Sequence, residues 1–326
     1  MNAILIINPT SGKTKRKMPP ILKWTFKKLK NKIKGIAKHK TTVDEIVQAV
    51  RRRCYKERIK LHVEYTQYPK HAIELAKAAK DKYDLIIVAG GDGTVNEVIN
   101  GMTTSINNKS SSKATLVIIP FGSTNVLALE LGIPFNVKES SELISNGKKI
   151  QIDLGYVKTA KESRYFSMMF GVGFDASLIK NISTKFKKRW GKLAYPLKGI
   201  KNIFMYTWNT IRVKHKSQSV GYFVVISNSK NYGGEYEIAS KASTTDGLLD
   251  LVIIDRGNWW KLVQIISSIS SGRKSNKFLK GEYYQIKEAQ ISSRQKMFVQ
   301  VDGEVIGALP ASVKVAPKAL NIMVKK

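Results

Sequence analysis

The chain has 326 residues, 43% of them hydrophobic, so we expect a globular protein with one large or two medium-sized domains. A net charge of +32 excludes a near-neutral surface and indicates a polyanionic partner, either nucleic acid or an anionic membrane. The single cysteine, Cys54, excludes an internal disulfide and favours a reducing compartment. The four histidines lack metal-ligand spacing, so no zinc site is expected.

The sequence predicts neither a membrane span nor export. No apolar run approaches the roughly 18 residues that a spanning helix needs. The opening MNAILIINPTSGK lacks a basic region, and its apolar stretch is too short for a signal peptide. We therefore expect a cytoplasmic protein.

Strands and helices alternate in the first part of the chain. Buried or half-buried strands are predicted over residues 3–7, 61–66, 85–89 and 114–120, with helices over 42–53, 71–79 and 94–102. Thr42 with Glu45, and Thr94 with Glu97, form T-x-x-E capping boxes at two helix starts. This order predicts a parallel α/β domain over residues 1–132, which ends at the Gly-Ile-Pro of 132–134.

Residues 13–60 form an unusual basic extension within that domain. The segment 21–38 has one apolar helical face and a second face rich in lysine. Such a helix suits the surface of an anionic membrane, but it equally suits a surface helix that packs its apolar stripe on the core. The apolar face carries Leu22, Phe26, Leu29, Ile33 and Ile36, and the basic face carries Lys23, Lys27, Lys30 and Lys34.

The pattern changes in the second part of the chain to short alternating stretches. These indicate an antiparallel β-sandwich or barrel over residues 133–311. The basic segment 185–201 contains three aromatic residues, a composition that suits single-stranded nucleic acid as well as a solvated helix. The closing stretch 312–326 is a candidate to pack back onto the first domain.

A glycine turn links the strand 85–89 to the following helix. In Gly90-Gly91-Asp92-Gly93-Thr94, three glycines let backbone N–H groups approach a phosphate, and the helix start favours an anion at the same place. A ligand-free turn that needs glycine for positive φ explains the same pattern. The turn is not G-x-G-x-x-G, and it lacks the lysine of a P-loop.

The whole string GGDGTVNEVINGM at 90–102 closely resembles the diacylglycerol-kinase-type catalytic domain, the superfamily of bacterial lipid kinases and sphingosine kinases. Further blocks follow the family's order: NPTSG at 8–12, GSTN at 122–125, FSMMFGVGFDA at 166–176, DGLLD at 246–250 and DGE at 302–304. The chain departs from the family at Val126, Met168 and Ser240, where aspartate, asparagine and proline are usual.

The resemblance implies transfer of the ATP γ-phosphoryl group to the hydroxyl of diacylglycerol or a similar lipid alcohol, with a sphingoid base or ceramide as alternatives. It implies a β-sandwich second domain, with Mg²⁺ and ATP as cofactors. Glu304 would be the base, and Asp302 would orient it or help with metal. Asp246, with the carbonyls of Ser243 and Leu248, would bind magnesium, and Asp92 would join that network. Nucleotide contacts would come from Asn8, Pro9, Thr10, Ser11, Gly12, Thr66, Gly90, Gly91, Asp92, Gly93, Thr94, Asn96, Glu97, Ser123 and Asn125.

Two other functions are compatible with part of this pattern. An NAD kinase would share GGDGT but should lack DGLLD and DGE. A non-catalytic membrane- or nucleic-acid-binding protein on the same fold would explain the charge, but the retained Asp92, Asp246 and Glu304 argue against it. For a lipid kinase we expect the substrate at an anionic membrane surface and a peripheral membrane location, and the sequence leaves a homodimer open.

Overall fold

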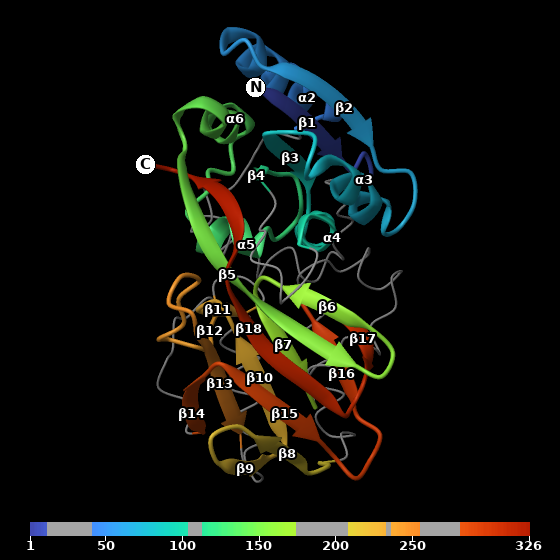
Figure 1. Cartoon of the computed structure of the whole chain (residues 1–326), viewed down its shortest axis with the longest axis vertical. Coiled ribbons are helices and arrows are strands. Elements are labelled where there is room, and N and C mark those ends of the chain that lie inside the picture. Colours follow the sequence, from blue (N-terminus) through green and yellow to red (C-terminus); the bar gives the residue numbers. More distant parts are fainter. Residues whose placement is uncertain (12–40, 104–112, 174–207, 233–235, 255–280) are drawn as a thin grey trace, which may run out of the picture.

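The computed structural model describes residues 1–11, 41–103, 113–173, 208–232, 236–254 and 281–326. An α/β domain lies at one end of the molecule and a β domain at the other, and two long strands run between them (Figure 1). The predicted basic helix 21–38, the basic segment 185–201 and Gly12 fall outside the described residues.

The α/β domain is built on four parallel strands in the order β2-β1-β3-β4. They are β1 (Asn2–Ile7), β2 (Lys60–Tyr65), β3 (Leu85–Gly90) and β4 (Thr115–Pro120). Every residue of β3 and β4 is buried, whereas the edge strand β2 is partly exposed. The apolar runs therefore predicted the central strands, because a strand covered on both faces cannot alternate in polarity.

Helices cover this sheet: α2 (Val43–Lys56), α3 (His71–Ala79), α4 (Asp92–Met102), α5 (Val126–Glu130) and α6 (Val137–Asn146). The capping box of Thr42 and Glu45 at α2 is confirmed. The capping box predicted at Thr94 is wrong, because α4 begins two residues earlier with Gly91 at its N-cap. The Glu97 carboxylate instead accepts the Lys70 N–H at 3.1 Å, at the start of α3.

Helix α6 was not predicted. It follows the predicted boundary at residue 132 in sequence, yet it packs against α2 of the first domain. Arg53 joins the two helices through an ion pair with Glu142 at 3.3 Å and a hydrogen bond to Ser145 Oγ at 3.3 Å. The Asn136 side chain caps α6 by accepting from two backbone N–H groups.

The β domain consists of antiparallel strands in two facing sheets, as predicted. One has the order β14-β13-β10-β7-β16-β17, and the other contains β5, β6, β18, β15, β8 and β9. Side chains from both sheets, among them Phe166, Phe170 and Leu251, share one core. The strands of these two sheets are β5 (Lys148–Thr159), β6 (Ser163–Phe166), β7 (Met169–Val172), β8 (Ile211–Lys214), β9 (Gln218–Gly221), β10 (Phe223–Ser227), β13 (Leu249–Ile254), β14 (Glu282–Ile286), β15 (Glu288–Ser292), β16 (Phe298–Val301), β17 (Glu304–Ala308) and β18 (Ala311–Val324). The short strands β11 (Asn231–Tyr232) and β12 (Tyr236–Glu237) pair with each other in a separate two-stranded sheet.

Strand β18 connects the two domains. It pairs with β5 along most of its length, and Ile322 pairs in parallel with Leu116 of β4. The pairing shifts between Ala316 and Leu320, where Lys318 has positive φ. One continuous sheet therefore extends from the α/β domain into the β domain, and this limits how the domains can sit relative to each other.

Candidate active site between the two domains

The loops at the carboxyl ends of the four parallel strands meet at one edge of the sheet. Asn8 follows β1, Thr66 follows β2, Gly91 follows β3 and Phe121 follows β4. The strand order reverses between β1 and β3. In open α/β sheets, ligands bind in the crevice at such a reversal point. The topology therefore makes Asn8 and the glycine turn a candidate ligand site, independently of any sequence motif.

Asn8 ties its own loop to the first turn of α4. Its Nδ2 donates to Thr94 Oγ1 at 3.0 Å. Its Oδ1 accepts from the N–H of Thr10 at 3.0 Å and from the hydroxyl of Thr10 at 2.8 Å. The predicted nucleotide residues Asn8, Thr10 and Thr94 thus form one hydrogen-bonded group across the reversal point.

The glycines of the site are needed because neighbouring atoms lie too close to leave room for a Cβ. A Cβ on Gly90 would lie 2.6 Å from Thr94 Cβ, and a Cβ on Gly122 would collide with the Gly91 backbone. The glycines with positive φ lie elsewhere, at 132, 173, 247 and 303, within the described residues. The alternative explanation of the turn, glycine for positive φ, is therefore wrong, and the backbones of two loops instead approach each other closely at Gly91 and Gly122.

Asp92 binds the second loop to the first. Its carboxylate accepts the Asn125 N–H at 3.0 Å and the Val126 N–H at 2.5 Å, at the start of α5. Asn125, at φ 51°, closes the loop by bonding both backbone groups of Gly122, at 2.9 and 3.0 Å. It also occupies the N-cap position of α5, which leaves Ser123 exposed in the middle of the loop. A magnesium role for Asp92 stays a prediction.

Asp302 joins the β domain to the α/β domain. Its carboxylate accepts hydrogen bonds from the N–H groups of Ser167, Met168 and Met169 at 2.9–3.1 Å, from Ser167 Oγ at 3.2 Å and from Asn96 Nδ2 at 2.7 Å. Burial raises the pKa of Asp302, and these backbone and hydroxyl donors oppose the rise. Fixed in this way, Asp302 is a brace between the domains.

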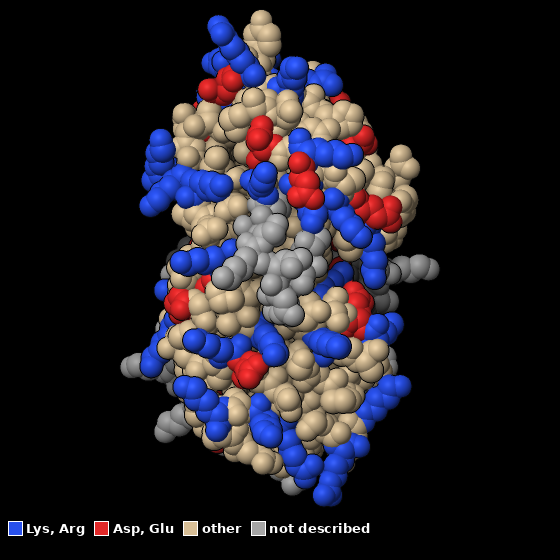
Figure 2. Space-filling view, in the orientation of Figure 1, with Lys and Arg blue, Asp and Glu red and all other residues tan. Residues whose placement is uncertain are grey.

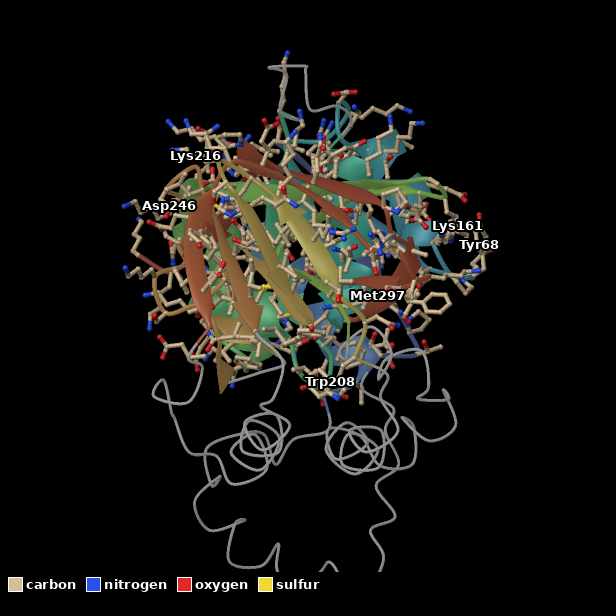
Figure 3. All side chains as sticks on the ribbon, turned by 90° about the horizontal axis from the view of Figure 1, so that it is seen from below. Tyr68, Lys161, Trp208, Lys216, Asp246 and Met297 are labelled. Carbon is tan, nitrogen blue, oxygen red and sulfur yellow. The ribbon has the colours of Figure 1, made fainter. Side chains whose placement is uncertain are left out.

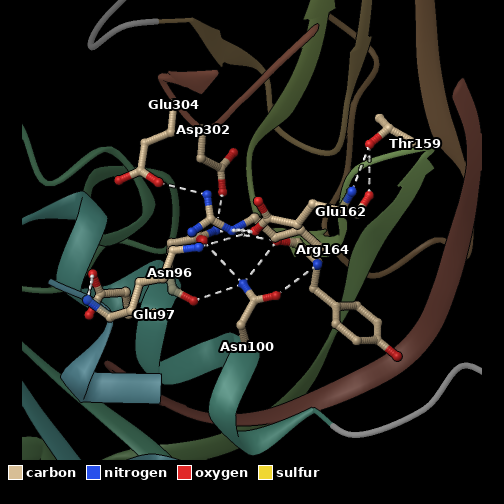
Figure 4. Close-up of polar contacts among 10 residues, drawn as sticks. Asn96, Glu97, Asn100, Thr159, Glu162, Arg164, Asp302 and Glu304 are labelled. Atoms are coloured by element: carbon tan, nitrogen blue, oxygen red, sulfur yellow. Dashed lines mark hydrogen bonds and ion pairs between the residues drawn. The ribbon is translucent and has the colours of Figure 1, made fainter. Parts of the chain in front are cut away.

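Glu304, two residues further on, is placed differently. Its side chain is 51% exposed, and Oε2 accepts from Arg164 Nη1 at 2.6 Å. Its Oε1 lies 3.6 Å from the position that a Cβ on Gly93 would occupy. An accessible carboxylate of the β domain therefore lies against the first turn of α4 (Figure 4).

A charged group that the sequence analysis missed adjoins Glu304 through Arg164. Arg164 of β6 is 5% exposed and also faces Glu162, with Nε 3.7 Å from Oε1, and Lys70 Nζ lies 3.8 Å from the same oxygen. Burial raises the pKa of Glu97, the backbone N–H of Lys70 lowers it, and the Glu304 charge raises it. The available signal was a basic residue inside the short predicted strand that contains Ser163–Phe166, next to a family block.

Two asparagines of α4 hold β6 in place. Asn100 donates to Tyr165 O at 3.0 Å and accepts from Tyr165 N at 2.8 Å. Asn96, a predicted nucleotide contact, is 6% exposed and bonds Asp302. Its nucleotide role stays a prediction, because the structure places the amide in the contact between the domains.

Comparisons with known proteins agree with this architecture. Residues 29–157 match the diacylglycerol kinase catalytic domain, and residues 169–324 match the YegS C-terminal NAD kinase beta sandwich-like domain. The chain belongs to the diacylglycerol-kinase-type lipid kinase superfamily.

Relatives of this lipid kinase include the diacylglycerol kinase of Bacillus subtilis (strain 168), 29% identical over 77% of this chain and 80% of that protein. The diacylglycerol kinase of Staphylococcus carnosus (strain TM300) is 29% identical over 74% of this chain and 76% of that protein. A solved structure of a diacylglycerol kinase from Bacillus anthracis str. Sterne superposes with a TM-score of 0.68 at 18% identity, over 99% of this chain and 97% of that one. That likeness shows the fold.

The predicted magnesium turn of the lipid kinase lies apart from Glu304. Asp246 and Lys161, which precedes β6, are at opposite sides of the molecule in Figure 3. Asp246 Oδ1 accepts the Leu248 N–H at 3.0 Å. Asp153, which the sequence analysis missed, supports the turn by accepting the Gly247 N–H at 2.6 Å and donating its own N–H to Thr244 O at 2.7 Å.

The atoms of this turn fit magnesium chemically. Mg²⁺ prefers oxygen ligands and uses one or two carboxylates together with water. In the part of the chain that the structure describes, no three His, Cys, Asp or Glu side chains form a metal-binding group. A magnesium site here would therefore depend on carbonyl oxygens beside the single Asp246 carboxylate.

No helix in the described ranges has the length and apolar character to cross a membrane.

Proposed function

We propose that this lipid kinase transfers the γ-phosphoryl group of ATP to the hydroxyl of diacylglycerol or a similar long-chain lipid alcohol. The observation that carries the proposal is the Glu304 carboxylate, which the β domain presents beside Gly93 of the glycine turn. Phosphoryl transfer requires the donor phosphate and the acceptor hydroxyl side by side, and a carboxylate next to a phosphate-binding turn would provide such a place. The names of the Bacillus and Staphylococcus relatives favour diacylglycerol over a sphingoid base or ceramide.

The glycine turn and the loop after β4 would hold the triphosphate. Their backbones touch at Gly91 and Gly122, so phosphate oxygens can approach the N–H groups at the start of α4 without meeting a Cβ. Asp92 and Asn8 hold these loops in position by the hydrogen bonds described above. The loops at Asn8–Ser11 and Thr66 would flank the rest of the nucleotide.

Magnesium is the second cofactor we propose. Asp246 and the carbonyl oxygens of Ser243 and Leu248 would hold an ion at their turn, and Asp92 would be the ligand nearest the triphosphate. Magnesium held near Asp92 would supply positive charge that neutralises phosphate oxygens, whereas an ion at the Asp246 turn, which lies apart from Glu304, would act on that turn. The chain's own residues align the two reactants, and alignment is the larger part of phosphoryl-transfer catalysis.

Glu304 is the group we propose as general base. As the lipid oxygen bonds to phosphorus and the bond from phosphorus to the ADP oxygen breaks, the Glu304 carboxylate accepts the hydroxyl proton. Its exposure leaves it accessible to a lipid hydroxyl. The Asp302 carboxylate already accepts five hydrogen bonds and holds the domains together, so its oxygens are occupied and we do not assign it the role of base.

Replacing Glu304 with alanine tests the assigned base. We expect kcat to fall about 10²–10⁴-fold, the usual contribution of a positioned base, while the Kd for ATP stays within about threefold. Glu288→Ala, which removes an exposed carboxylate of β15 elsewhere in the β domain, is the matched control and should keep full activity. Unchanged turnover of Glu304→Ala would remove this residue from the base role.

A panel of acceptors tests the substrate class. With ATP, Mg²⁺ and anionic vesicles, we expect phosphate transfer to diacylglycerol in preference to sphingosine or ceramide. NAD belongs in the panel because the second domain matches an NAD kinase-like family model. Transfer to NAD alone, or to none of the lipids, would reject a lipid substrate.

A further inference from the structure

Arg164 occupies an unusual place for a residue with no assigned role. Its side chain is 5% exposed, yet it points at the half-exposed Glu304, with Nη1 donating to Oε2 at 2.6 Å. On its other side, Nε lies 3.7 Å from Glu162 Oε1. The guanidinium therefore lies between two carboxylates at the boundary of the domains (Figure 4).

Stability alone is a weak reason for this arrangement. Removing a guanidinium from water is costly, and its attraction to a partner that remains half in water recovers little of that cost. An apolar side chain would serve packing in a buried strand as well or better. The arginine therefore contributes something besides burial, and its planar fork of donors is suited to orienting a carboxylate.

The frame behind Arg164 is rigid. The next residue, Tyr165, exchanges two hydrogen bonds with Asn100 of α4, so β6 is fixed to the helix that starts at the glycine turn. Glu162 restrains the guanidinium from behind, and Lys70 Nζ lies 3.8 Å from that carboxylate. Each element that positions Arg164 is thus connected to α4.

In the part of the chain that the structure describes, little besides Arg164 orients Glu304. It follows Gly303, at φ 84°, in the turn between β16 and β17, and half of its side chain is exposed. A free glutamate at such a position would sample several rotamers. The bond from Arg164 selects the arrangement in which Oε1 lies beside Gly93.

We propose that Arg164 is a positioning residue that holds the Glu304 carboxylate beside the glycine turn, where the lipid hydroxyl and the γ-phosphate meet. The proposal rests on the proposed function. Arg164 acts through Glu304, so its removal should lower turnover and leave nucleotide affinity unaltered. A direct phosphate ligand would behave in the opposite way, since its loss raises the KM for ATP.

The first experiment compares Arg164→Gln and Arg164→Lys with the matched control Lys158→Gln, an exposed basic residue on the neighbouring strand β5. We expect Arg164→Gln to lower kcat by about tenfold or more with the KM for ATP within about twofold. Arg164→Lys should recover part of the loss, because it restores the charge without the planar fork. Lys158→Gln should match the wild type.

The second experiment combines Arg164→Gln with Glu304→Gln and follows residual transfer with radiolabelled ATP. If Arg164 acts through Glu304, adding Arg164→Gln lowers the residual rate by less than about twofold. If the double variant instead loses activity by the product of the two single-variant reductions, the proposal is overturned. A raised KM for ATP at unchanged kcat in Arg164→Gln would also overturn it.

Thermal unfolding verifies that each variant is folded. If Arg164→Gln does not fold, Arg164→Lys replaces it in the same double-mutant cycle. A wild-type protein inactive on every lipid rejects the proposed function, whereas an active one with multiplying losses rejects the role of Arg164 alone.

Discussion

Cys54 lies on the buried face of α2 and is 1% exposed. Burial raises its pKa to about 11, because the thiolate loses its hydration. The thiolate is the reactive form, so only about one thiol in a thousand is reactive at pH 8. We expect a thiol reagent at pH 8 to label the native protein at least tenfold more slowly than the urea-unfolded protein. Equal rates would show that α2 opens readily.

Asp250 carries a buried charge that the folded protein disfavours. It is completely buried, and burial raises its pKa, with a further rise from the charge of Asp246 and an opposing hydrogen bond from the Tyr283 hydroxyl. Folding therefore favours the protonated acid. The resulting stability is fully present below the ordinary pKa of 3.8 and is lost as pH rises through the higher pKa of the folded state.

Asp250→Asn should mimic the protonated acid. We expect urea midpoints of this variant above those of the wild type at pH 7–8, with the difference vanishing near pH 4. Asp81→Asn, at an exposed carboxylate, serves as the control and should show no such trend. A variant that is less stable than the wild type at pH 8 would contradict a buried, disfavoured charge.

At the scale of elements, the site depends on two loops that touch. Gly91 after β3 and Gly122 after β4 lie backbone to backbone, and Asp92 and Asn125 hold the two loops together. Because the contact involves main chain on both sides, neither loop can yield to an added methyl group by turning a side chain. The start of α4 and the start of α5 therefore form one unit.

Two glycine-to-alanine substitutions distinguish the backbone contact at Gly122 from the general effect of replacing glycine in a helix. Gly122→Ala should lower stability by about 1–3 kcal/mol and weaken ATP binding, because its Cβ collides with the Gly91 backbone. Gly93→Ala should keep or raise stability, since its Cβ meets Glu304 at an ordinary 3.6 Å and alanine favours the helix by about 1 kcal/mol. Urea unfolding and nucleotide titration measure both. Equal stability of the two variants would contradict the backbone contact.

At the scale of the whole molecule, charge is the dominant property. Lys and Arg outnumber Asp and Glu by 56 to 24, and the face in Figure 2 shows basic side chains on both domains. We propose that this charge brings the enzyme to an anionic, cytoplasmic membrane surface where its lipid substrate lies. Polybasic segments near such a surface contribute about 1 kcal/mol per cation, reduced by salt.

Replacing Lys23, Lys27, Lys30 and Lys34 with glutamine tests this attraction. We expect weaker binding to anionic vesicles, most clearly at ionic strength near 0.01 M, where screening is weak. Neutral vesicles provide the control and should not distinguish the variant from the wild type. If binding to anionic vesicles is unchanged, the predicted helix over 21–38 packs on the protein and does not anchor it.

Much of the architecture was readable from the sequence, because it follows from local patterns. The buried runs became β1, β3 and β4, and Thr42 with Glu45 capped α2. The glycine turn was located between β3 and α4, although the helix begins two residues earlier than predicted. The helix α6 and the partner of Glu97 were missed, because an amphipathic stretch of ten residues is weak evidence of a helix and a capping box is one of several uses of a glutamate.

The sequence by itself determined the fold class, the family and the position of the glycine turn, each of which depends on residues close together in the chain. Only the tertiary structure decided that Asp302 braces the domains while Glu304 faces the turn, and that Arg164 holds Glu304 from 140 residues away. Such pairs form because β18 and the packing of two sheets bring distant strands together. Their geometry comes from that packing, which hydrophobic periodicity does not specify.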